Sequence, residues 1–171
     1  LGFFILESRK GGVLNSETIG DGVLISFFQS VSARTAGFYS IDLSKIKDST
    51  SILLISLMFI GGSPGSTAGG IKTTTFAVLL LAVISVIKNE KEPIVYKRRI
   101  SNDTIKKALS IFVITLFLLI IVSFVITAIE DFSYIDVLYE TASALGTVGA
   151  TRGITDKLSD VSKILITICM Y

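Results

Sequence analysis

Residues 140–153 read ETASALGTVGATRG, and this stretch decides how the chain is organised. It lies between an uncharged run, residues 108–129, and a second apolar run that continues to the last residue. Its centre, Thr147-Val148-Gly149, is matched in the first half of the chain by Thr35-Ala36-Gly37. Each triplet follows a short amphipathic segment that contains Ser-Ala. A glycine-bearing loop too polar to face lipid, placed twice between apolar segments, is what an ion pathway requires.

The composition indicates an integral membrane protein. Half of the residues are hydrophobic, the mean hydropathy is +0.73, and only 18% are charged, against about a quarter in soluble domains. Residues 108–129 carry no charge, and about 20 apolar residues span the hydrocarbon core of a bilayer. The alternative is a central helix of a large soluble protein, but such helices are usually shorter. The single Cys169 and the absence of histidine predict no disulfide framework, metal cluster or nucleophile–base pair, and so no enzyme.

The first forty positions predict a helix end followed by a half-helix. Residues 1–6 resemble the end of a membrane helix, closed by the polar residues 7–10. Because the sequence shows no signal peptide and its last apolar run is cut off at Tyr171, we expect a fragment. Residues 18–34 are too short to cross a membrane and predict a half-helix that ends at residues 35–38, which we call the first loop. An interfacial helix followed by a turn is the alternative. The apolar residues of this segment recur at helical spacing: Val23, Leu24, Phe27, Phe28 and Val31.

Residues 49–87 predict one membrane helix that is interrupted near its middle. This segment contains a single charge, Lys72. A straight helix of that length would measure about 58 Å, against a hydrocarbon core of about 30 Å. Five glycines and a proline in close succession cannot sustain a helix, so we expect a break, which we call the Gly-rich loop. Its residues are Gly61, Gly62, Ser63, Pro64, Gly65, Ser66, Thr67, Ala68, Gly69 and Gly70.

The distribution of charge predicts the orientation in the membrane. Residues 88–107 hold seven Lys or Arg, including Lys91 and Lys97, and three acids, whereas residues 129–160 hold two basic and six acidic side chains. The positive-inside rule places the basic connection in the cytoplasm, which puts both glycine-bearing loops near the outer face.

The second half of the chain repeats the order of the first. After residues 108–129, we expect an amphipathic segment at 134–145, with Ile135, Leu138, Ala142 and Leu145 on one face. Residues 147–150, the second loop, follow, and an inbound helix begins near Lys163. We therefore expect an all-α integral membrane protein with potassium-channel-like membrane–pore-loop–membrane repeats of about 110 residues. Residues 1–88 form one repeat, 89–107 the cytoplasmic connection, and 108–171 the next repeat.

The two loops have the residues that a potassium-type filter needs. Such a filter replaces the hydration shell of the ion with backbone carbonyls, which requires unusual dihedrals that glycine adopts without a Cβ penalty. Gly37 and Gly149 are therefore expected at the strained positions, and Thr35 and Thr147 can add hydroxyl oxygens. The negative C-terminal ends of the preceding half-helices favour a cation. The predicted filter residues are Thr35, Ala36, Gly37, Phe38, Thr147, Val148, Gly149 and Ala150.

Charged residues near the loops leave alternatives open. GSTAGGIKT at 65–73 resembles a phosphate-binding loop, but Ile71 separates Gly70 from Lys72 and no βαβ pattern follows. Lys72, a charge at membrane depth, is either functional or paired to carbonyls of the Gly-rich loop. For Arg34 we expect structural pairing with an acid such as Glu140, while the role of Arg152 stays open. Glu140 can bind such a partner instead of an ion.

Three motifs resemble the Trk/Ktr/HKT superfamily of potassium uptake proteins, and most closely its KtrB-like, sodium-dependent branch. They are FFQSVSARTAGF at 27–38, FIGGSPGSTAGGIKTTTF at 59–76 and SALGTVGATRGIT at 143–155. The resemblance implies four repeats around one pore, of which this chain holds the third and fourth, with Gly37 and Gly149 as filter glycines. It also implies that residues 59–75, Lys72 among them, form an intramembrane loop beneath the filter that gates the pore.

The resemblance further implies partners and alternatives. Members dimerise in the cell membrane and associate with a cytoplasmic ring of nucleotide-binding regulatory subunits; no nucleic-acid partner is expected. The transported ion is K+, with Na+ as a second ion. The alternatives are a sodium-conducting relative and a non-conducting membrane subunit that binds regulators.

Overall fold

The chain folds into helices joined by loops and short 3-10 turns. The computed structural model describes residues 2–9, 11–15, 17–66, 68–88, 93–95 and 98–170, so Thr67 of the Gly-rich loop, Lys91 and Lys97 lie outside it, as do Leu1, Lys10 and Tyr171. The helices are α1 (Gly2–Glu7), α2 (Ile19–Ser32), α3 (Asp48–Phe59), α4 (Thr73–Ile87), α5 (Asn102–Ile129), α6 (Tyr134–Leu145) and α7 (Asp160–Cys169). The remaining elements are the 3-10 turns η1 (Leu43–Lys45) and η2 (Thr155–Lys157) and a two-residue hairpin of β1 (Ile94–Val95) and β2 (Arg98–Arg99). The predicted helical class is confirmed.

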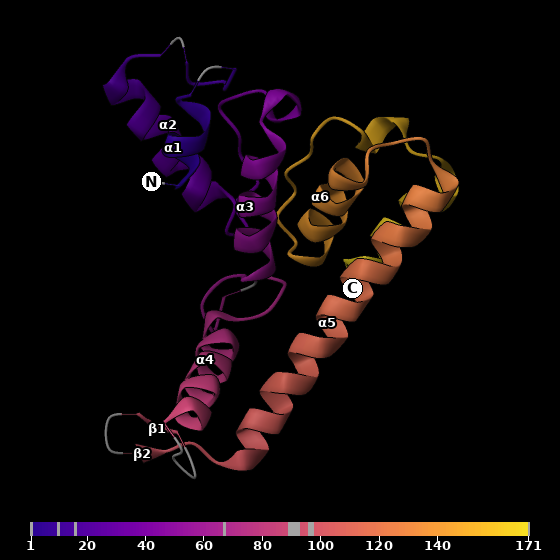
Figure 1. Ribbon diagram of the computed structural model, residues 1–171. Coiled ribbons are helices and arrows are strands. Elements are labelled where there is room, and N and C mark those ends of the chain that lie inside the picture. Colours follow the sequence, from indigo (N-terminus) through magenta and orange to yellow (C-terminus); the bar gives the residue numbers. More distant parts are fainter. Residues whose placement is uncertain are drawn as a thin grey trace.

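Helix α6 lies at the centre of one end of the molecule, between α3 and α5 (Figure 1). Helices α1 and α2 lie on the opposite side of α3, and α7 packs against α5 and α6. At the other end, α4 follows α3. Among the described helices, α5 alone makes extensive contacts with α4. The long helix α5 therefore connects a well-packed end, which carries both loops, to a thin end made of α4 and α5.

In the described part of the chain, α5 alone is long and apolar enough to cross a membrane. Its 28 residues correspond to about 42 Å, more than the roughly 30 Å of the hydrocarbon core. The helix begins at Asn102, because the Ser101 side chain caps it by accepting a hydrogen bond from the Thr104 amide. It therefore begins before the uncharged run does, and Lys106 and Lys107 belong to its first two turns.

The interrupted helix is confirmed: α3 ends at Phe59 and α4 begins at Thr73. Two hydrogen bonds close the base of the intervening segment, from the Gly61 amide to the Ile71 carbonyl (2.9 Å) and from the Ile71 amide to the Phe59 carbonyl (3.2 Å). Ile71 is fully buried. The segment is thus a loop with a fixed base: backbone groups that no longer bond within a helix bond to each other across the two ends of the loop.

Helix α2 forms where the sequence predicts a half-helix, but its packing is inverted relative to a soluble amphipathic helix. All five of its predicted apolar residues are exposed, whereas the small and polar residues Gly22, Ser26, Gln29 and Ser32 are buried. A Cβ on Gly22 would lie 3.0 Å from the Phe4 ring, so glycine permits a close approach to α1. The apolar face of α2 therefore points away from the described residues, as expected of a surface in contact with lipid or with other membrane segments.

Burial on α6 extends beyond the predicted face, on which Ala142 is buried and Leu138 and Leu145 pack against the core. Ile135, Leu138 and Leu145 are only half-buried, and residues on every side of the helix are buried instead, including Tyr139 and Thr141. The reason is the central place of α6, which contacts both α3 and α5. A helix that is buried all round does not keep a single apolar stripe.

The element boundaries follow the internal repeat. Turn η1 begins at Leu43 and helix α3 at Asp48, while turn η2 begins at Thr155 and helix α7 at Asp160. The two turns are separated along the sequence by the same number of residues as the two helices. The threonine–glycine triplets of the two loops have this separation too. Helix, loop, 3-10 turn and helix thus follow one another twice with nearly the same spacing.

Candidate functional site

In each loop, the first residue, a threonine, and the third residue, a glycine, have left-handed backbone conformations. The φ angles are 71° at Thr35, 74° at Gly37, 51° at Thr147 and 86° at Gly149. The two glycines have the unusual dihedrals expected of them, although their place in a filter stays a prediction, and the left-handed threonines were not predicted. A β-branched residue in this region is an outlier that costs on the order of 1–3 kcal/mol, and such strain is concentrated at functional sites.

Hydrogen bonds at the end of α6 hold Thr147 in this conformation. The Val148 amide donates to the Ser143 carbonyl (2.8 Å) and the Thr147 amide to the Ala144 carbonyl (2.9 Å). This is the pair of bonds that ends many helices, with threonine in the position that usually takes glycine. At the end of α2, the Ala36 and Gly37 amides both donate to the Ser32 carbonyl. The Ser32 hydroxyl also donates to the Phe38 carbonyl, which fixes the first loop against its own helix.

The two loops lie against each other. A Cβ placed on Gly37 would lie 2.2 Å from the Val148 carbonyl oxygen, a distance at which no side chain fits. Val148 and Ala150 are buried in the core that also contains Ala33 and Met58. The contact therefore places backbone of the first loop directly beside a carbonyl of the second.

The Gly-rich loop contacts the second loop through backbone and hydroxyl groups. The Gly69 amide donates to Thr147 Oγ1 (2.8 Å), and the Gly70 amide donates to the Leu145 carbonyl (3.1 Å). A Cβ on Gly69 would lie 2.7 Å from Thr147 Cγ2, so glycine is required for this approach. The Thr147 hydroxyl, predicted as an ion ligand, is thus an acceptor for the Gly-rich loop.

Lys72 is paired with carbonyls of the Gly-rich loop, which is one of the two roles that the sequence predicts for it. Its Nζ donates to the carbonyl oxygens of Ser66 (3.0 Å) and Ala68 (2.5 Å), and the side chain is half-buried. The ammonium group thereby replaces part of its hydration with backbone oxygens and closes the far side of the loop. This pairing does not by itself give Lys72 a role in gating, which stays a prediction.

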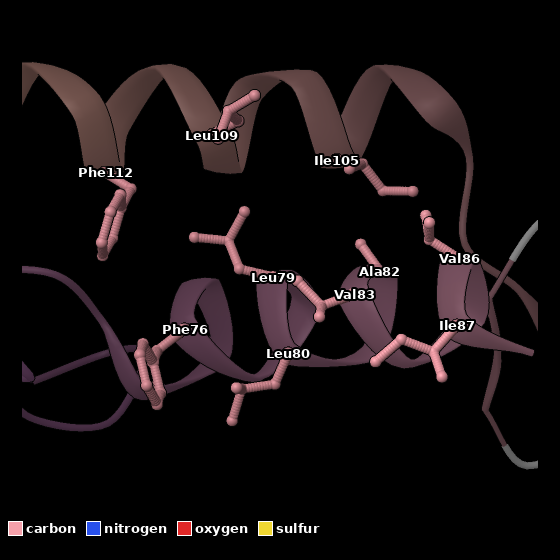
Figure 2. Close-up of a pocket in the computed structure, with 10 residues that line it drawn as sticks. All are labelled: Phe76, Leu79, Leu80, Ala82, Val83, Val86, Ile87, Ile105, Leu109 and Phe112. Carbon is pink, nitrogen blue, oxygen red and sulfur yellow. The ribbon is translucent and has the colours of Figure 1, made fainter.

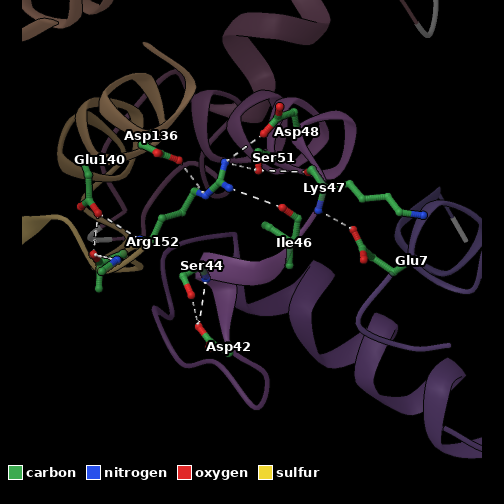
Figure 3. Close-up of polar contacts among 12 residues, drawn as sticks. Glu7, Asp42, Ser44, Ile46, Lys47, Asp48, Ser51, Asp136, Glu140 and Arg152 are labelled. Atoms are coloured by element: carbon green, nitrogen blue, oxygen red, sulfur yellow. Dashed lines mark hydrogen bonds and ion pairs between the residues drawn. The ribbon is translucent and has the colours of Figure 1, made fainter. Parts of the chain in front are cut away.

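Glu140, one helical turn after Asp136 on α6, holds the chain that follows the second loop (Figure 3). Its carboxylate accepts hydrogen bonds from the Thr151 hydroxyl (2.5 Å), the Arg152 amide (3.0 Å) and the Thr155 hydroxyl (2.8 Å). The first half of the chain has Phe28 at the matching position of the repeat. Glu140 therefore binds the Arg152 amide and two threonine hydroxyls, whereas the sequence predicted an arginine side chain as its partner, and this support is particular to the chain that follows the second loop.

The Arg152 guanidinium joins α6 to the start of α3. Its Nε lies 3.1 Å from an Asp136 carboxylate oxygen and its Nη1 lies 3.7 Å from Asp48, while Nη1 donates to the Ser51 hydroxyl (2.9 Å) (Figure 3). Arg152 is buried, whereas Arg34 is exposed and has no ion pair with a described residue. The expected pairing of Arg34 with an acid is therefore wrong. It is Arg152 that is paired, because it lies between two helices while Arg34 is at a free helix end.

A second buried carboxylate fixes the other side of α3. Glu7 is fully buried and accepts hydrogen bonds from the Val13 amide (2.9 Å), the Lys47 amide (3.0 Å) and the Thr50 hydroxyl (2.5 Å). It ties the end of α1 to the first turn of α3. The sequence gives no signal for the contact with α3, since Glu7 and its partners Lys47 and Thr50 are far apart along the chain.

The oxygen atoms presented at the two loops are those of carbonyls and threonine hydroxyls. In the described residues, no three His, Cys, Asp or Glu side chains lie close enough together to hold a metal ion. Glu140 and Arg152 both have their polar atoms directed to protein partners.

The long apolar helix, the outward apolar face of α2 and the interrupted helix are consistent with a helical membrane protein. The chain belongs to the TrkH family, described as cation transport proteins, whose match extends over residues 2–171. It is 40% identical over 168 residues to Ktr system potassium uptake protein B of Bacillus subtilis (strain 168), covering 98% of this chain and 38% of that protein. It is 38% identical to Ktr system potassium uptake protein B of Vibrio alginolyticus, covering 98% and 37%. It is 37% identical over 172 residues to potassium/sodium uptake protein NtpJ of Enterococcus hirae, covering 98% and 38%. The chain thus spans about two fifths of the length of these relatives.

Proposed function

We propose that the chain forms part of the ion-translocating pore of a Trk/Ktr-type potassium uptake system. The observation that carries this proposal is the recurrence, at matching positions of the repeat, of a left-handed threonine and glycine in two loops that touch each other. Carbonyls of residues 35–38 and 147–150 would replace the water around K+. The carbonyl ends of α2 and α6 precede these loops and favour a cation there.

Within this proposal, the Gly-rich loop and Lys72 form the gate. Support comes from the hydrogen bond of Gly69 to Thr147 in the second loop and that of Gly70 to Leu145 at the end of α6, which bring the interruption of the membrane helix against the proposed ion-binding backbone. Interrupted membrane helices commonly carry ion sites or hinges in transport proteins. The loop has a fixed base at Ile71 and a long glycine-containing tip, so the tip can move while the helices stay in place.

The remaining steps of the proposal concern the whole protein. It is a multi-pass protein of the cell membrane, with residues 88–107 in the cytoplasm and both loops near the outer face. Further segments of a longer chain supply the other repeats of the filter. The full-length chain forms a dimer, and a cytoplasmic ring of nucleotide-binding subunits acts on the Gly-rich loop. Na+ serves as the second ion of the uptake system.

Replacement of Gly149 by Asp in the full-length protein tests the filter. The substitution places a carboxylate at a left-handed position among the carbonyls, so cells that lack other potassium uptake should fail to grow at limiting potassium. Gly153→Asp is the matched control, because Gly153 is also left-handed, with φ 85°, and lies outside the second loop. Unchanged growth of the Gly149 variant would contradict the filter assignment.

Shortening of the Gly-rich loop tests the gate. Removal of residues 63–65 leaves the base at Ile71 and the Gly69 contact intact, and it should raise potassium flux if the tip is a barrier. Unaltered or lower flux in a variant that still inserts would contradict the gate.

Competition between K+ and Na+ in uptake separates the leading proposal from a sodium-conducting relative. NtpJ, one of the similar proteins, is named for both ions. A non-conducting regulatory subunit predicts that neither variant changes the flux of either ion.

A further inference from the structure

An apolar groove of about 510 Å³ runs between α4 and α5 (Figure 2). Its walls include Leu79 and Val83 on α4 and Ile105 and Leu109 on α5, and the residues that line it are all hydrophobic. Figure 2 shows Leu79 of α4 and Ile105 of α5 directed toward the facing helix. The groove lies in the thin end of the molecule, where α4 has α5 as its only extensive helical neighbour among the described residues.

The groove reaches from the Gly-rich loop to the basic end of the two helices. At one end is Phe112, whose ring packs edge-on against Phe59, the last residue of α3, with ring centroids 5.8 Å apart. At the other end lie Ile87 and Ile105, and each is followed directly in sequence by an exposed lysine, Lys88 and Lys106.

Charge at this end complements an anionic group. Lys88, Lys106 and Lys107 are exposed, and the acidic residue nearest in sequence that the structure describes is the exposed Asp103. Basic residues beside a membrane helix attract anionic lipid head groups, and each such residue raises the affinity about fivefold. An apolar groove whose lining residues Ile87 and Ile105 are each followed by an exposed lysine suits the acyl chain and negative head group of a phospholipid better than a water-soluble ligand.

We propose that the α4–α5 groove binds one acyl chain of an anionic phospholipid, with the phosphate held by Lys88 and Lys106. The acyl chain fills the space between α4 and α5, and it reaches Phe112, whose ring packs against Phe59 at the end of α3. The lipid thereby fixes the position of α4, the helix that directly follows that loop. This site is independent of the proposed filter.

Native mass spectrometry of the full-length protein tests the site, with dioleoyl phosphatidylglycerol and dioleoyl phosphatidylcholine as probes that share the same acyl chains. We expect one phosphatidylglycerol to be retained under conditions that remove phosphatidylcholine. Leu79→Trp with Leu109→Trp fills the groove and should abolish the retention of that lipid. Ile114→Trp is the control, because Ile114 is an exposed residue of α5 outside the groove.

Matched lysine variants test the head-group contact. Lys106→Gln should lower phosphatidylglycerol retention about fivefold, since one basic contact is lost. Lys107→Gln should leave it unchanged, because Lys107 lies on the opposite side of the α4–α5 contact, against Thr74 and Val78. Potassium uptake in cells reports that each variant is folded.

Three results would overturn the proposal. The first is equal retention of both lipids, and the second is full retention in the Leu79→Trp, Leu109→Trp variant. The third is equal loss in the Lys106 and Lys107 variants, which would indicate a general attraction of anionic lipid to the basic surface. If the groove-filling variant instead dissociates a dimer without changing lipid retention, the occupant is a second copy of the chain and the lipid site is refuted.

Discussion

The amide of Gly69 donates a hydrogen bond of 2.8 Å to the hydroxyl of Thr147, which joins the Gly-rich loop to the second loop. The same threonine is strained at φ 51°, and a Cβ on Gly69 would collide with its methyl group. The contact therefore depends on a residue of unusual conformation meeting a residue without a side chain. Any movement of the Gly-rich loop away from the second loop has to break this bond.

Replacement of Thr147 by Val removes this hydrogen bond while keeping the shape of the side chain. The loss of one such bond amounts to about 1 kcal/mol, or roughly a fivefold shift in the population of a loop that can move. We expect a higher rate of potassium uptake in the Thr147→Val protein, measured in proteoliposomes, and a normal rate in Thr147→Ser.

Thr35→Val is the matched control in the first loop, where the hydroxyl has no hydrogen bond to a described residue. If Thr35→Val and Thr147→Val change uptake equally, the Thr147 hydroxyl acts as an ion ligand like its counterpart, and its contact with Gly69 does not restrain the Gly-rich loop.

Alanine substitutions at three left-handed glycines separate steric contact from backbone strain. Any side chain in this conformation costs about 1–2 kcal/mol. At Gly37 a methyl group would also lie 2.2 Å from the Val148 carbonyl oxygen, whereas nothing lies within 4 Å of a Cβ on Gly149 or Gly153. We expect Gly37→Ala to lower potassium uptake about tenfold more than Gly149→Ala, with Gly153→Ala close to the parent protein. The measurement is rubidium uptake at equal amounts of inserted protein. Equal loss in the Gly37 and Gly149 variants would show that the two loops are not in contact in the membrane.

Much of the fold could be predicted because it follows from local patterns. The bounds of α6, the break between Phe59 and Thr73, and the spacing of the internal repeat all come from apolar runs and glycines within short stretches. The inverted packing of α2 could not be predicted in this way. An apolar stripe has the same sequence pattern whether it faces a protein core or lipid. Only the neighbours of Ser26 and Gln29 decide which face of α2 is buried.

The parts of the site that could not be predicted depend on distant residues. Arg152 has its partners Asp48 and Ser51 in the first half of the chain, and no spacing rule connects them. The left-handed threonines follow from hydrogen bonds at the ends of α2 and α6, and Thr147 also contacts Gly69. Sequence placed the glycines correctly, because glycine is the residue that usually takes such positions, but it offered no reason to place threonine there.

Removal of the Arg152 side chain should destabilise the packing between α3 and α6. Arg152→Met leaves Asp136 without its ion pair, and breaking a buried pair costs about 3 kcal/mol at the lower end of the usual range. We expect the thermal midpoint of the full-length protein in detergent to fall by about 5 °C, as measured by fluorescence-detected size exclusion. Arg152→Lys should fall less, because it keeps the charge but loses the planar fork.

Arg34→Met is the control for this experiment, since Arg34 is exposed and has no ion pair with a described residue. Asp136→Asn should reduce the effect of Arg152→Met in the double variant, because the two residues then share one lost interaction. Strict additivity of the two substitutions would contradict the ion pair.

Glu130, at the end of α5, should make the start of α7 sensitive to acid. Hydrogen bonds from the Ser159 side chain and amide, and from Ser162, hold the pKa of the Glu130 carboxyl below its usual 4.5. Because the pKa is lowered in the folded state, its contribution is complete above pH 4.5 and is lost as the pH falls through the folded-state value. We expect the amide protection factors of residues 159–163 to fall in that acidic range, as measured by hydrogen exchange with mass spectrometry. In Glu130→Gln they should already be low at neutral pH and change little with pH, whereas Asp131→Asn should behave as the parent protein does. Protection in Glu130→Gln equal to that of the parent at neutral pH would show that α7 begins at Asp160 through the Ser159 cap alone, without the carboxylate.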